Sequence, residues 1–176
     1  MKLLKELTEK SVGVEPAGEI LDETFRLRKS ARGVLFNEKT EICLQFVSKH
    51  KYYKLPGGGV DIGESIEEAL KRELIEEVGC DSVIKEDLGI VIEYRNKWDL
   101  LHISYGFIAN VNGIIGEPSY EQRELDDGFE SVWVSLVEAI NLLKKNKVPE
   151  HYAGIFIVER ELAFLEEALR LKQKSN

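Results

Sequence analysis

The chain has 176 residues, of which 43% are hydrophobic and 32% charged, enough for one sizeable core but too little to favour two independent domains. Its 24 Lys and Arg residues against 32 Asp and Glu residues leave a formal net charge of −8. This balance argues against nucleic-acid binding through a broad basic face, but it permits a small anionic ligand where divalent cations reverse the field of an acidic cleft.

Residues 1–28 precede the main pattern, and we expect them to pack on one domain formed by residues 29–176. They begin with a short amphipathic segment and continue through a loop at residues 16–18. Charged residues interleave with the first leucines, so we expect no signal peptide.

Cysteine content and hydropathy bear on the cellular compartment. Cys43 and Cys80 are too few for a disulfide framework, which favours a reducing environment. No run approaches the roughly 20 apolar residues of a membrane span. We therefore expect a cytoplasmic protein with no membrane segment.

Three strands are predicted before residue 60. Ala31–Phe36 and Glu41–Val47 are rich in β-favouring residues, and the four residues between them predict a hairpin. A third short strand, Tyr52–Leu55, leads directly into Pro-Gly-Gly-Gly. Glycines at the end of a strand let the backbone approach a ligand closely.

A helix with clear ends follows the glycines. Ser65 and Glu68 have the spacing of a capping box, and Gly79 stands where a helix-terminating glycine is expected. Apolar residues recur between them at helical intervals, namely Ile66, Ala69, Leu70, Leu74 and Val78.

The rest of the chain predicts further strands and then two helices. Strands are expected at residues 88–94, 100–111 and 131–134, with a polar loop at 112–128. Helices are expected from Leu136 to Asn146 and again after Pro149. The order predicts an α+β domain in which helices cover a mixed sheet. The apolar stripe of the last helix is assigned to the core or, alternatively, to a homodimer contact; its residues are Val158, Leu162, Leu165 and Leu169.

Three carboxylates share one face of the central helix. At about 100° per residue, Glu73, Glu76 and Glu77 fall within an arc of about 100° that overlaps the apolar stripe. A solvated acidic face is the alternative for a Glu-rich helix. Like charges close to a core repel one another, so the overlap favours a bound counter-ion, and hard divalent cations prefer carboxylate oxygen. We expect Glu77→Gln to spare folding because it relieves this repulsion.

The segment from Gly58 to Cys80 resembles the Nudix box. With its intervals it reads Gly58-x5-Glu64-x7-Arg72-Glu73-Leu74-x-Glu76-Glu77-x-Gly79-Cys80, against G-x5-E-x7-R-E-U-x-E-E-x-G-U with U aliphatic. Every fixed position agrees except the last, where Cys80 replaces an aliphatic residue. A buried cysteine behaves as a small hydrophobe, so the departure has little consequence. The order of strands and helices from about residue 29 onward is also similar to that family.

This resemblance implies a Nudix-type α/β/α sandwich and a magnesium site, with Mn²⁺ as a substitute. Glu73, Glu76 and Glu77 would bind the cation together with the carbonyl of Gly57. Arg72 and Glu64 would fix the loop against the helix and orient these carboxylates. Gly58 and Gly59 would border the substrate.

Further candidates lie outside the box. Among the carboxylates of the loop from Tyr120 to Asp127, Glu124 is favoured as the general base. Lys54 precedes the glycines and is a candidate for contacting phosphate. Tyr94 and Trp98 are candidates for stacking on a base, with packing at a sheet edge as the alternative.

These expectations define a Mg²⁺-dependent hydrolase that cleaves a diphosphate linkage in a small nucleotide-like compound. By elimination of other specificities, the default substrate is a (deoxy)nucleoside triphosphate, including an oxidised one. A nucleotide-sugar or dinucleoside polyphosphate pyrophosphatase is one alternative. A nucleotide-sensing module without turnover is another, which the complete set of carboxylates argues against.

Overall fold

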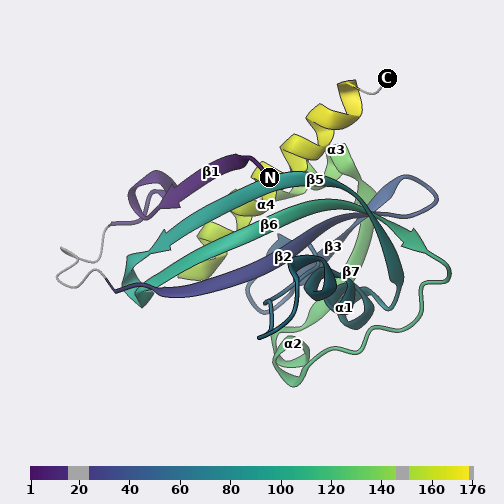
Figure 1. The fold of residues 1–176 in the computed structure, drawn as a ribbon, viewed down its shortest axis with the longest axis horizontal. Coiled ribbons are helices and arrows are strands. Elements are labelled where there is room, and N and C mark those ends of the chain that lie inside the picture. Colours follow the sequence, from purple (N-terminus) through teal and green to yellow (C-terminus); the bar gives the residue numbers. More distant parts are fainter. Residues whose placement is uncertain (16–23, 146–150, 175–176) are drawn as a thin grey trace.

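A mixed β-sheet organises the protein (Figure 1). The computed structural model describes residues 1–15, 24–145 and 151–174. The strands are β1 (Leu3–Thr8), β2 (Arg26–Phe36), β3 (Glu41–Val47), β4 (Tyr52–Lys54), β5 (Asp81–Arg95), β6 (Leu100–Asn112) and β7 (Phe129–Ser135). Their order is β1-β5-β6-β2-β3-β4, and β7 pairs with β3. Strand β1 is parallel to β5 and β2 is parallel to β6, while the other neighbours are antiparallel.

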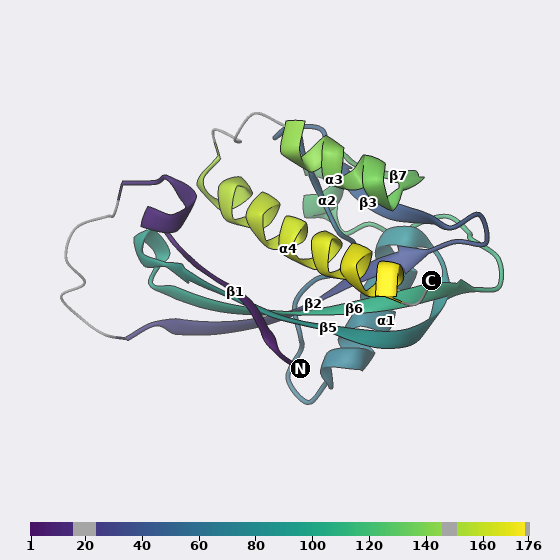
Figure 2. The same ribbon diagram turned by 90° about the horizontal axis from the view of Figure 1, so that it is seen from above.

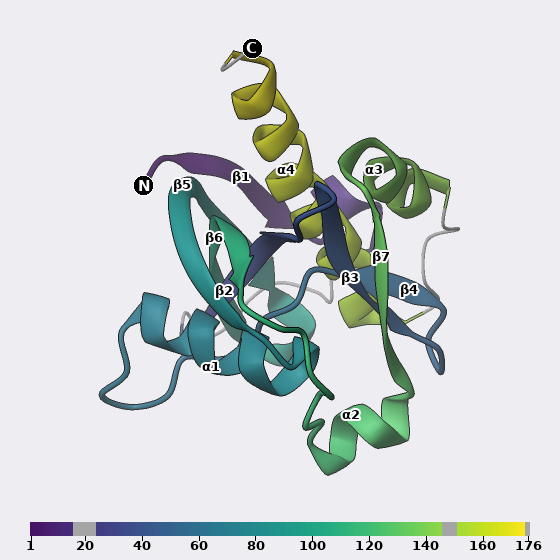
Figure 3. The same ribbon diagram turned by 90° about the vertical axis from the view of Figure 1, so that its right-hand side faces the viewer.

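Helices cover both faces of this sheet. The helices are α1 (Ile66–Val78), α2 (Gln122–Asp127), α3 (Leu136–Lys145) and α4 (Tyr152–Lys174), with 3₁₀ turns at Lys10–Val12 and Asn96–Trp98. Helix α1 lies on one face, while α3 and α4 lie side by side on the other (Figure 2 and Figure 3). The α+β architecture predicted from the order of elements is confirmed.

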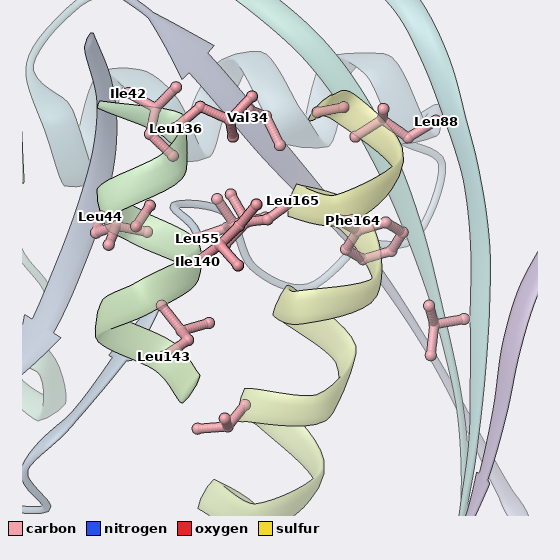
Figure 4. Packing of buried hydrophobic residues seen from close by; sticks show 14 of the residues in the cluster. Val34, Ile42, Leu44, Leu55, Leu88, Leu136, Ile140, Leu143, Phe164 and Leu165 are labelled. Atoms are coloured by element: carbon pink, nitrogen blue, oxygen red, sulfur yellow. The ribbon is translucent and has the colours of Figure 1, made fainter. Parts of the chain in front are cut away.

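Each face of the sheet has its own hydrophobic core. On the α1 face, Leu70 belongs to a cluster with Ala31 and Leu35 of β2. On the opposite face, Ile140 of α3 and Leu165 of α4 belong to a larger cluster and lie between the two helices (Figure 4). The stripe predicted on the last helix packs into this second core.

Strand β2 contributes to both faces because side chains alternate along a strand. Ala31 and Leu35 face α1, and a Cβ placed on Gly33 would lie 3.2 Å from Leu70 Cδ1. Val34 belongs instead to the core under α3 and α4. Residues 28, 30 and 32 lie an even number of positions from Val34 along the strand, so their side chains face the same side of the sheet, the side that α4 covers.

Helix α1 begins and ends where the sequence predicts. The Ser65 hydroxyl accepts a hydrogen bond from the Glu68 backbone N–H at 3.2 Å, and the Glu68 carboxylate accepts one from the Ser65 N–H at 2.9 Å. At the other end, Gly79 adopts a left-handed conformation with φ 73°, and its N–H donates to the Ile75 carbonyl at 3.0 Å. The predicted capping box and C-terminal glycine are confirmed.

Ser65→Ala should lower the free energy of unfolding by about 1 kcal/mol, because the substitution removes the acceptor for the Glu68 N–H. Urea denaturation measures the change. Ser65→Asp retains a side-chain acceptor and should keep most of the stability. Equal midpoints for wild type and Ser65→Ala would contradict the capping role.

Two strands extend further into polar sequence than predicted. Strand β2 begins at Arg26 rather than Ala31, and β5 begins at Asp81 rather than Leu88. The additional residues pair with β6. Backbone pairing does not require apolar side chains, so the alternation of hydrophobic residues underestimates the length of both strands.

Other segments differ in type. Leu3–Thr8 forms an edge strand beside β5, and Gln122–Asp127 forms a short helix inside the predicted polar loop. The predicted loop at residues 16–18, together with Asn146 and Pro149, lies outside the described residues. None of the helices in the described ranges has both the length and the apolar character needed to span a bilayer.

Candidate functional site

A cavity of about 330 Å³ lies where α1, the glycine loop, β2, α2 and α4 meet. Carboxylates from α1 and α2 line part of it, and arginines from β2, β5 and α4 line another part. Its charged lining residues are Arg28, Arg32, Lys54, Asp61, Arg72, Glu73, Glu76, Glu77, Arg95, Glu121, Arg123, Glu124, Asp127 and Arg160.

The glycine loop is hydrogen-bonded to the backbone of β2. The N–H of Ala31 donates to the Gly58 carbonyl at 3.0 Å, and the N–H of Gly33 donates to the Pro56 carbonyl at 3.0 Å. Val60 donates in turn to the Lys29 carbonyl at 3.1 Å. The loop therefore runs beside β2 as a short, irregular extra strand with a fixed position.

Two of the glycines are required by close contacts. Gly57 has a φ of 127°, and a Cβ there would lie 2.2 Å from the Ala31 carbonyl oxygen. A Cβ on Gly58 would lie 2.1 Å from Glu73 Oε1. Any side chain at either position would push the loop away from β2 or from the carboxylates of α1.

Arg72 connects the loop to the acidic face of α1. Its Nε donates to Glu64 Oε1 at 3.1 Å, and its Nη2 donates to the Gly59 carbonyl at 2.9 Å. Its Nη1 donates to both Glu73 at 2.9 Å and Glu76 at 3.0 Å. The hydrogen bond to Glu64, followed by that to Glu73, raises the pKa of Arg72, so this guanidinium stays charged.

Glu77 is the most buried carboxylate of the set, with 1% of its surface exposed. It accepts hydrogen bonds from the Gly57 N–H at 2.7 Å and from Lys54 Nζ at 2.8 Å. The Lys54 ammonium also lies over the Phe129 ring, 4.4 Å from its centroid. The overlap of Glu77 with the apolar stripe in helical projection predicts this burial.

The carboxylate oxygens of Glu73, Glu76 and Glu77 are donors that suit a hard divalent cation. Glu73, Glu76 and Glu77 line one cavity, and burial together with the charge of Glu77 raises the pKa of Glu73. Arg72 and Lys54 supply the positive charge that these carboxylates meet. Within the described part of the chain no three acidic, His or Cys side chains already converge as a ligand cage, so the carboxylates must turn from these partners to bind a cation.

Glu124 reaches the cavity from α2. One of its carboxylate oxygens accepts a hydrogen bond from the Glu121 backbone N–H at 2.9 Å, as the partner in a capping box. Burial, and then the charge of Glu77, raises the pKa of Glu124 to about 7. Its position beside Glu77 brings a residue from the predicted loop to the carboxylates of the box.

The structure places the predicted stacking residues elsewhere. Tyr94 and Trp98 are not among the residues that line the cavity. Tyr94 packs edge-on against Phe25, with ring centroids 6.3 Å apart, and Trp98 packs against Tyr152 at 4.9 Å. Both aromatic side chains contribute to packing near the end of β5.

The sequence does not predict the arginine-rich wall that lines another part of the cavity. It consists of Arg28 and Arg32 on β2, Arg95 at the end of β5, and Arg160 on α4. The alternation of Arg28, Ser30 and Arg32 ahead of an apolar run is the one sequence signal that indicates it.

Two buried carboxylates hold this wall together. Glu93 accepts from Arg160 Nη1 at 3.0 Å and from Arg95 Nε at 2.6 Å, and Glu161 accepts from Arg160 Nη2 at 2.5 Å. Burial opposes the ionisation of Glu93, yet the charge of Arg160 lowers its pKa well below the usual range. Arg32 lies 3.7 Å from Glu161, while its Nε and Nη1 are buried without a hydrogen bond among the described residues.

His102 should make stability depend on pH. Burial lowers its pKa to about 4, although Glu93 opposes this shift, and its Nε2 lies 2.9 Å from the Ser30 hydroxyl. Between pH 6.5 and 4 the unfolded chain takes up a proton that the folded protein does not, so the unfolding free energy should fall by about 1.4 kcal/mol per pH unit as the pH decreases.

His102→Gln should flatten this dependence in urea denaturation followed from pH 7 to 4.5. His151, whose pKa is also lowered by burial, makes His151→Gln a matched control with a smaller effect, because this histidine is exposed. An unchanged slope in His102→Gln would show that another group titrates.

Known proteins resemble this chain in sequence. The model of the NUDIX domain family matches residues 26–155. Nudix hydrolase 21, chloroplastic, from Arabidopsis thaliana is 37% identical over 130 residues, which cover 72% of this chain and 59% of the plant protein. The 8-oxo-dGTP diphosphatase of Haemophilus influenzae is 36% identical over 108 residues, covering 59% of this chain and 73% of that protein. The chain spans about half the length of several curated relatives it matches.

Solved structures of other proteins also share this fold. The MutT protein from Methanosarcina mazei Go1 aligns with a TM-score of 0.53 and 26% identity, over 78% of this chain and 96% of that protein. This similarity confirms the predicted layered fold with its central mixed sheet.

Proposed function

Since the chain belongs to the Nudix family, we propose that it is a pyrophosphohydrolase that cleaves a diphosphate linkage in a nucleotide-like compound with the help of Mg²⁺. One observation carries this proposal. Glu73, Glu76 and Glu77 line the same cavity as the glycine loop, and Arg72 ties the loop to the helix that bears them. A structural ion-pair network would not need a glycine loop beside it.

The carboxylates of α1 and the glycine loop would together bind the cation. When bound, Mg²⁺ supplies Lewis-acid activation of water and neutralises charge that develops on the phosphate oxygens, and Mn²⁺ can substitute for it. Glu73, Glu76 and Glu77 would hold the cation, with the Gly57 carbonyl as a further oxygen donor. Arg72, held by Glu64, would position those carboxylates through its hydrogen bonds to Glu73 and Glu76.

Glu124 is our candidate for the general base. Hydrolysis needs a group that takes a proton from water as its oxygen attacks phosphorus and the bond to the leaving phosphate breaks. Glu124 lines the cavity beside Glu77, and a carboxyl group with a pKa near neutral accepts a proton effectively at neutral pH. Lys54, on the same side of the cavity, can meet a phosphate oxygen once Glu77 turns to a cation.

A (deoxy)nucleoside triphosphate, including an oxidised one, remains the default substrate. The name of the Haemophilus influenzae relative supports this choice. Whatever the base, the three carboxylates lie within one and a half turns of one helix, so a cation held there would act only on neighbouring phosphate groups. We therefore expect compounds with a diphosphate linkage to be cleaved, while nucleoside monophosphates and nitrophenyl phosphate are left essentially untouched.

The test is a panel of nucleoside triphosphates, nucleotide sugars and dinucleoside polyphosphates assayed with Mg²⁺ for release of phosphate or pyrophosphate. Hydrolysis in ¹⁸O-labelled water, followed by mass spectrometry, locates the attacked phosphorus. Undiminished activity in excess chelator would remove the metal from the mechanism. Efficient turnover of monophosphates, or label found on carbon, would overturn the proposed reaction.

A further inference from the structure

The arginine wall has more positive charge than its own residues neutralise. Three of its four arginines pair with the buried carboxylates Glu93 and Glu161, namely Arg32, Arg95 and Arg160, whereas Arg28 pairs with neither. His102 is neutral above about pH 4. The wall therefore holds four positive charges against two negative charges, a surplus of two.

Part of this surplus sits on Arg32, two of whose nitrogen atoms lack a hydrogen-bond partner among the described residues. Arg32 has 6% of its surface exposed, and its Nε and Nη1 make no hydrogen bond within the described residues. A buried charged donor without a hydrogen bond loses its hydration without compensation, so such groups are rare unless a ligand or water receives them. Arg28 takes part in no ion pair among the described residues and borders Gly59, with its Nη2 3.8 Å from a Cβ placed there.

The register of the sheet places Arg28 and Arg32 in the cavity, beside the glycine loop. Residues 28 and 32 share the α4 side of β2, and the backbone of residues 29–33 hydrogen-bonds to the glycine loop. The charges of Glu73 and Glu77 act on Arg32, so the two ends of the cavity are close enough to interact. A ligand held at the carboxylates by its diphosphate would extend past the loop toward the arginines.

Binding of a cation weakens the attraction between the carboxylates of α1 and the arginines. The charges of Glu73 and Glu77 act on Arg32, and the charge of Glu73 acts on Arg28. A disubstituted diphosphate carries two negative charges, which one divalent cation at these carboxylates would offset. Arg28 and Arg32 would then lack a counter-charge beyond the Glu161 carboxylate, 3.7 Å from Arg32.

We propose that Arg28 and Arg32 form a second anion subsite, which binds a phosphate monoester of the substrate that is distinct from the diphosphate being cleaved. Arg95 and Arg160 support the subsite through Glu93 and Glu161. The substrate class is thus a nucleotide-like diphosphate with an additional phosphate group at its far end. This inference rests on the proposed function, because it places the diphosphate at the carboxylates.

Binding of ligands that cannot be hydrolysed tests the subsite separately from catalysis. Adenosine 2′,5′-bisphosphate and 3′,5′-bisphosphate each carry one more phosphate than adenosine 5′-monophosphate, and none contains a diphosphate linkage. In isothermal titration with Mg²⁺, at least one bisphosphate should bind wild type about tenfold more tightly than the monophosphate, the gain from charge-assisted hydrogen bonds to one more dianion.

Substitutions then locate the effect. Because Arg28 is exposed, the Arg28→Gln variant should fold normally. It should reduce the tenfold ratio of affinities toward one. Arg32→Lys keeps the buried charge but loses the planar fork, so it should reduce the ratio partly. Lys29→Gln removes one charge from the opposite side of the same strand and should leave the ratio unchanged.

Each result has a defined meaning. A wild-type ratio near one for both bisphosphates overturns the subsite. Equal weakening of the monophosphate and the bisphosphates in Arg28→Gln also overturns it, since the arginines would then hold the common 5′-phosphate. Hydrolysis of diphosphates with a ratio near one leaves the proposed function standing without the subsite. A tenfold ratio in a protein that hydrolyses no diphosphate supports the subsite and removes the function.

Discussion

Glu77→Gln should lower kcat by about a hundredfold or more, the scale on which rate is lost when one key electrostatic group is removed from a catalytic site. Glu77 is the most buried of the three box carboxylates, and it is fixed by the Gly57 N–H and by Lys54. A neutral amide can still accept the hydrogen bond from Gly57, but it provides no charge for a cation. The measurement is steady-state hydrolysis with Mg²⁺ of whichever diphosphate compound the panel identifies.

Glu67→Gln is the matched control, because it makes the same substitution on an exposed position of α1 away from the cavity. It should leave kcat unchanged. Activity of Glu77→Gln within a few-fold of wild type would exclude Glu77 from the catalytic machinery.

The structure changes the expectation for the stability of this variant. Considered from helix spacing alone, Glu77→Gln relieves crowding among like charges and should spare folding. In the folded protein, Glu77 is instead the partner of the buried Lys54 ammonium. Removing one member of a buried pair leaves the other uncompensated, so Glu77→Gln should also melt at a lower temperature. Activity must therefore be compared below the onset of unfolding.

Arg160→Met should reduce the free energy of unfolding by about 3–5 kcal/mol, the loss that follows when one partner of a buried ion pair is removed. Arg160 has 1% of its surface exposed and is hydrogen-bonded to both Glu93 and Glu161, neither of which is accessible to solvent. Methionine occupies a similar volume, so the effect reports lost charge and hydrogen bonds rather than a cavity. Since domains are stable by about 5–15 kcal/mol, such a loss is close to unfolding for a marginal protein.

Urea denaturation with linear extrapolation measures this change. Arg170→Met on the same helix is the control, because Arg170 is partly exposed and its partner Glu167 also pairs with Lys2, so the loss should be small. A loss below about 1 kcal/mol for Arg160→Met would mean that the network is dispensable for folding.

The spacing of residues within one helix predicts much of the part of the site that carries the carboxylates. The capping box at Ser65 and the terminating Gly79 lie within one helix, and the shared face of its glutamates follows from helical geometry. The resemblance to the Nudix box places the glycine loop next to them. These features depend on residues that are close in sequence, so the chain alone is sufficient to predict them.

The arginine half depends on contacts that pattern does not encode. Arg28 and Arg160 line the same cavity because β2 pairs in parallel with β6 and α4 crosses the sheet above them, and neither the pairing nor the crossing is visible in local periodicity. For the same reason, position near a strand end leaves both stacking on a base and packing at a sheet edge open for Tyr94 and Trp98. In the fold, Arg95 reaches the cavity while its aromatic neighbours do not.

In our proposals, strand β2 would separate hydrolysis from recognition of the additional phosphate, because its two faces carry different residues. Its odd-numbered residues, such as Ala31 and Leu35, support the helix that bears the carboxylates, whereas Arg28 and Arg32 face the opposite side. Point substitutions at the even positions can thus diversify ligand preference during evolution without disturbing the helix. A single-residue insertion or deletion within Arg26–Phe36 cannot, because it would exchange the two sets of side chains and bury the arginines beneath α1.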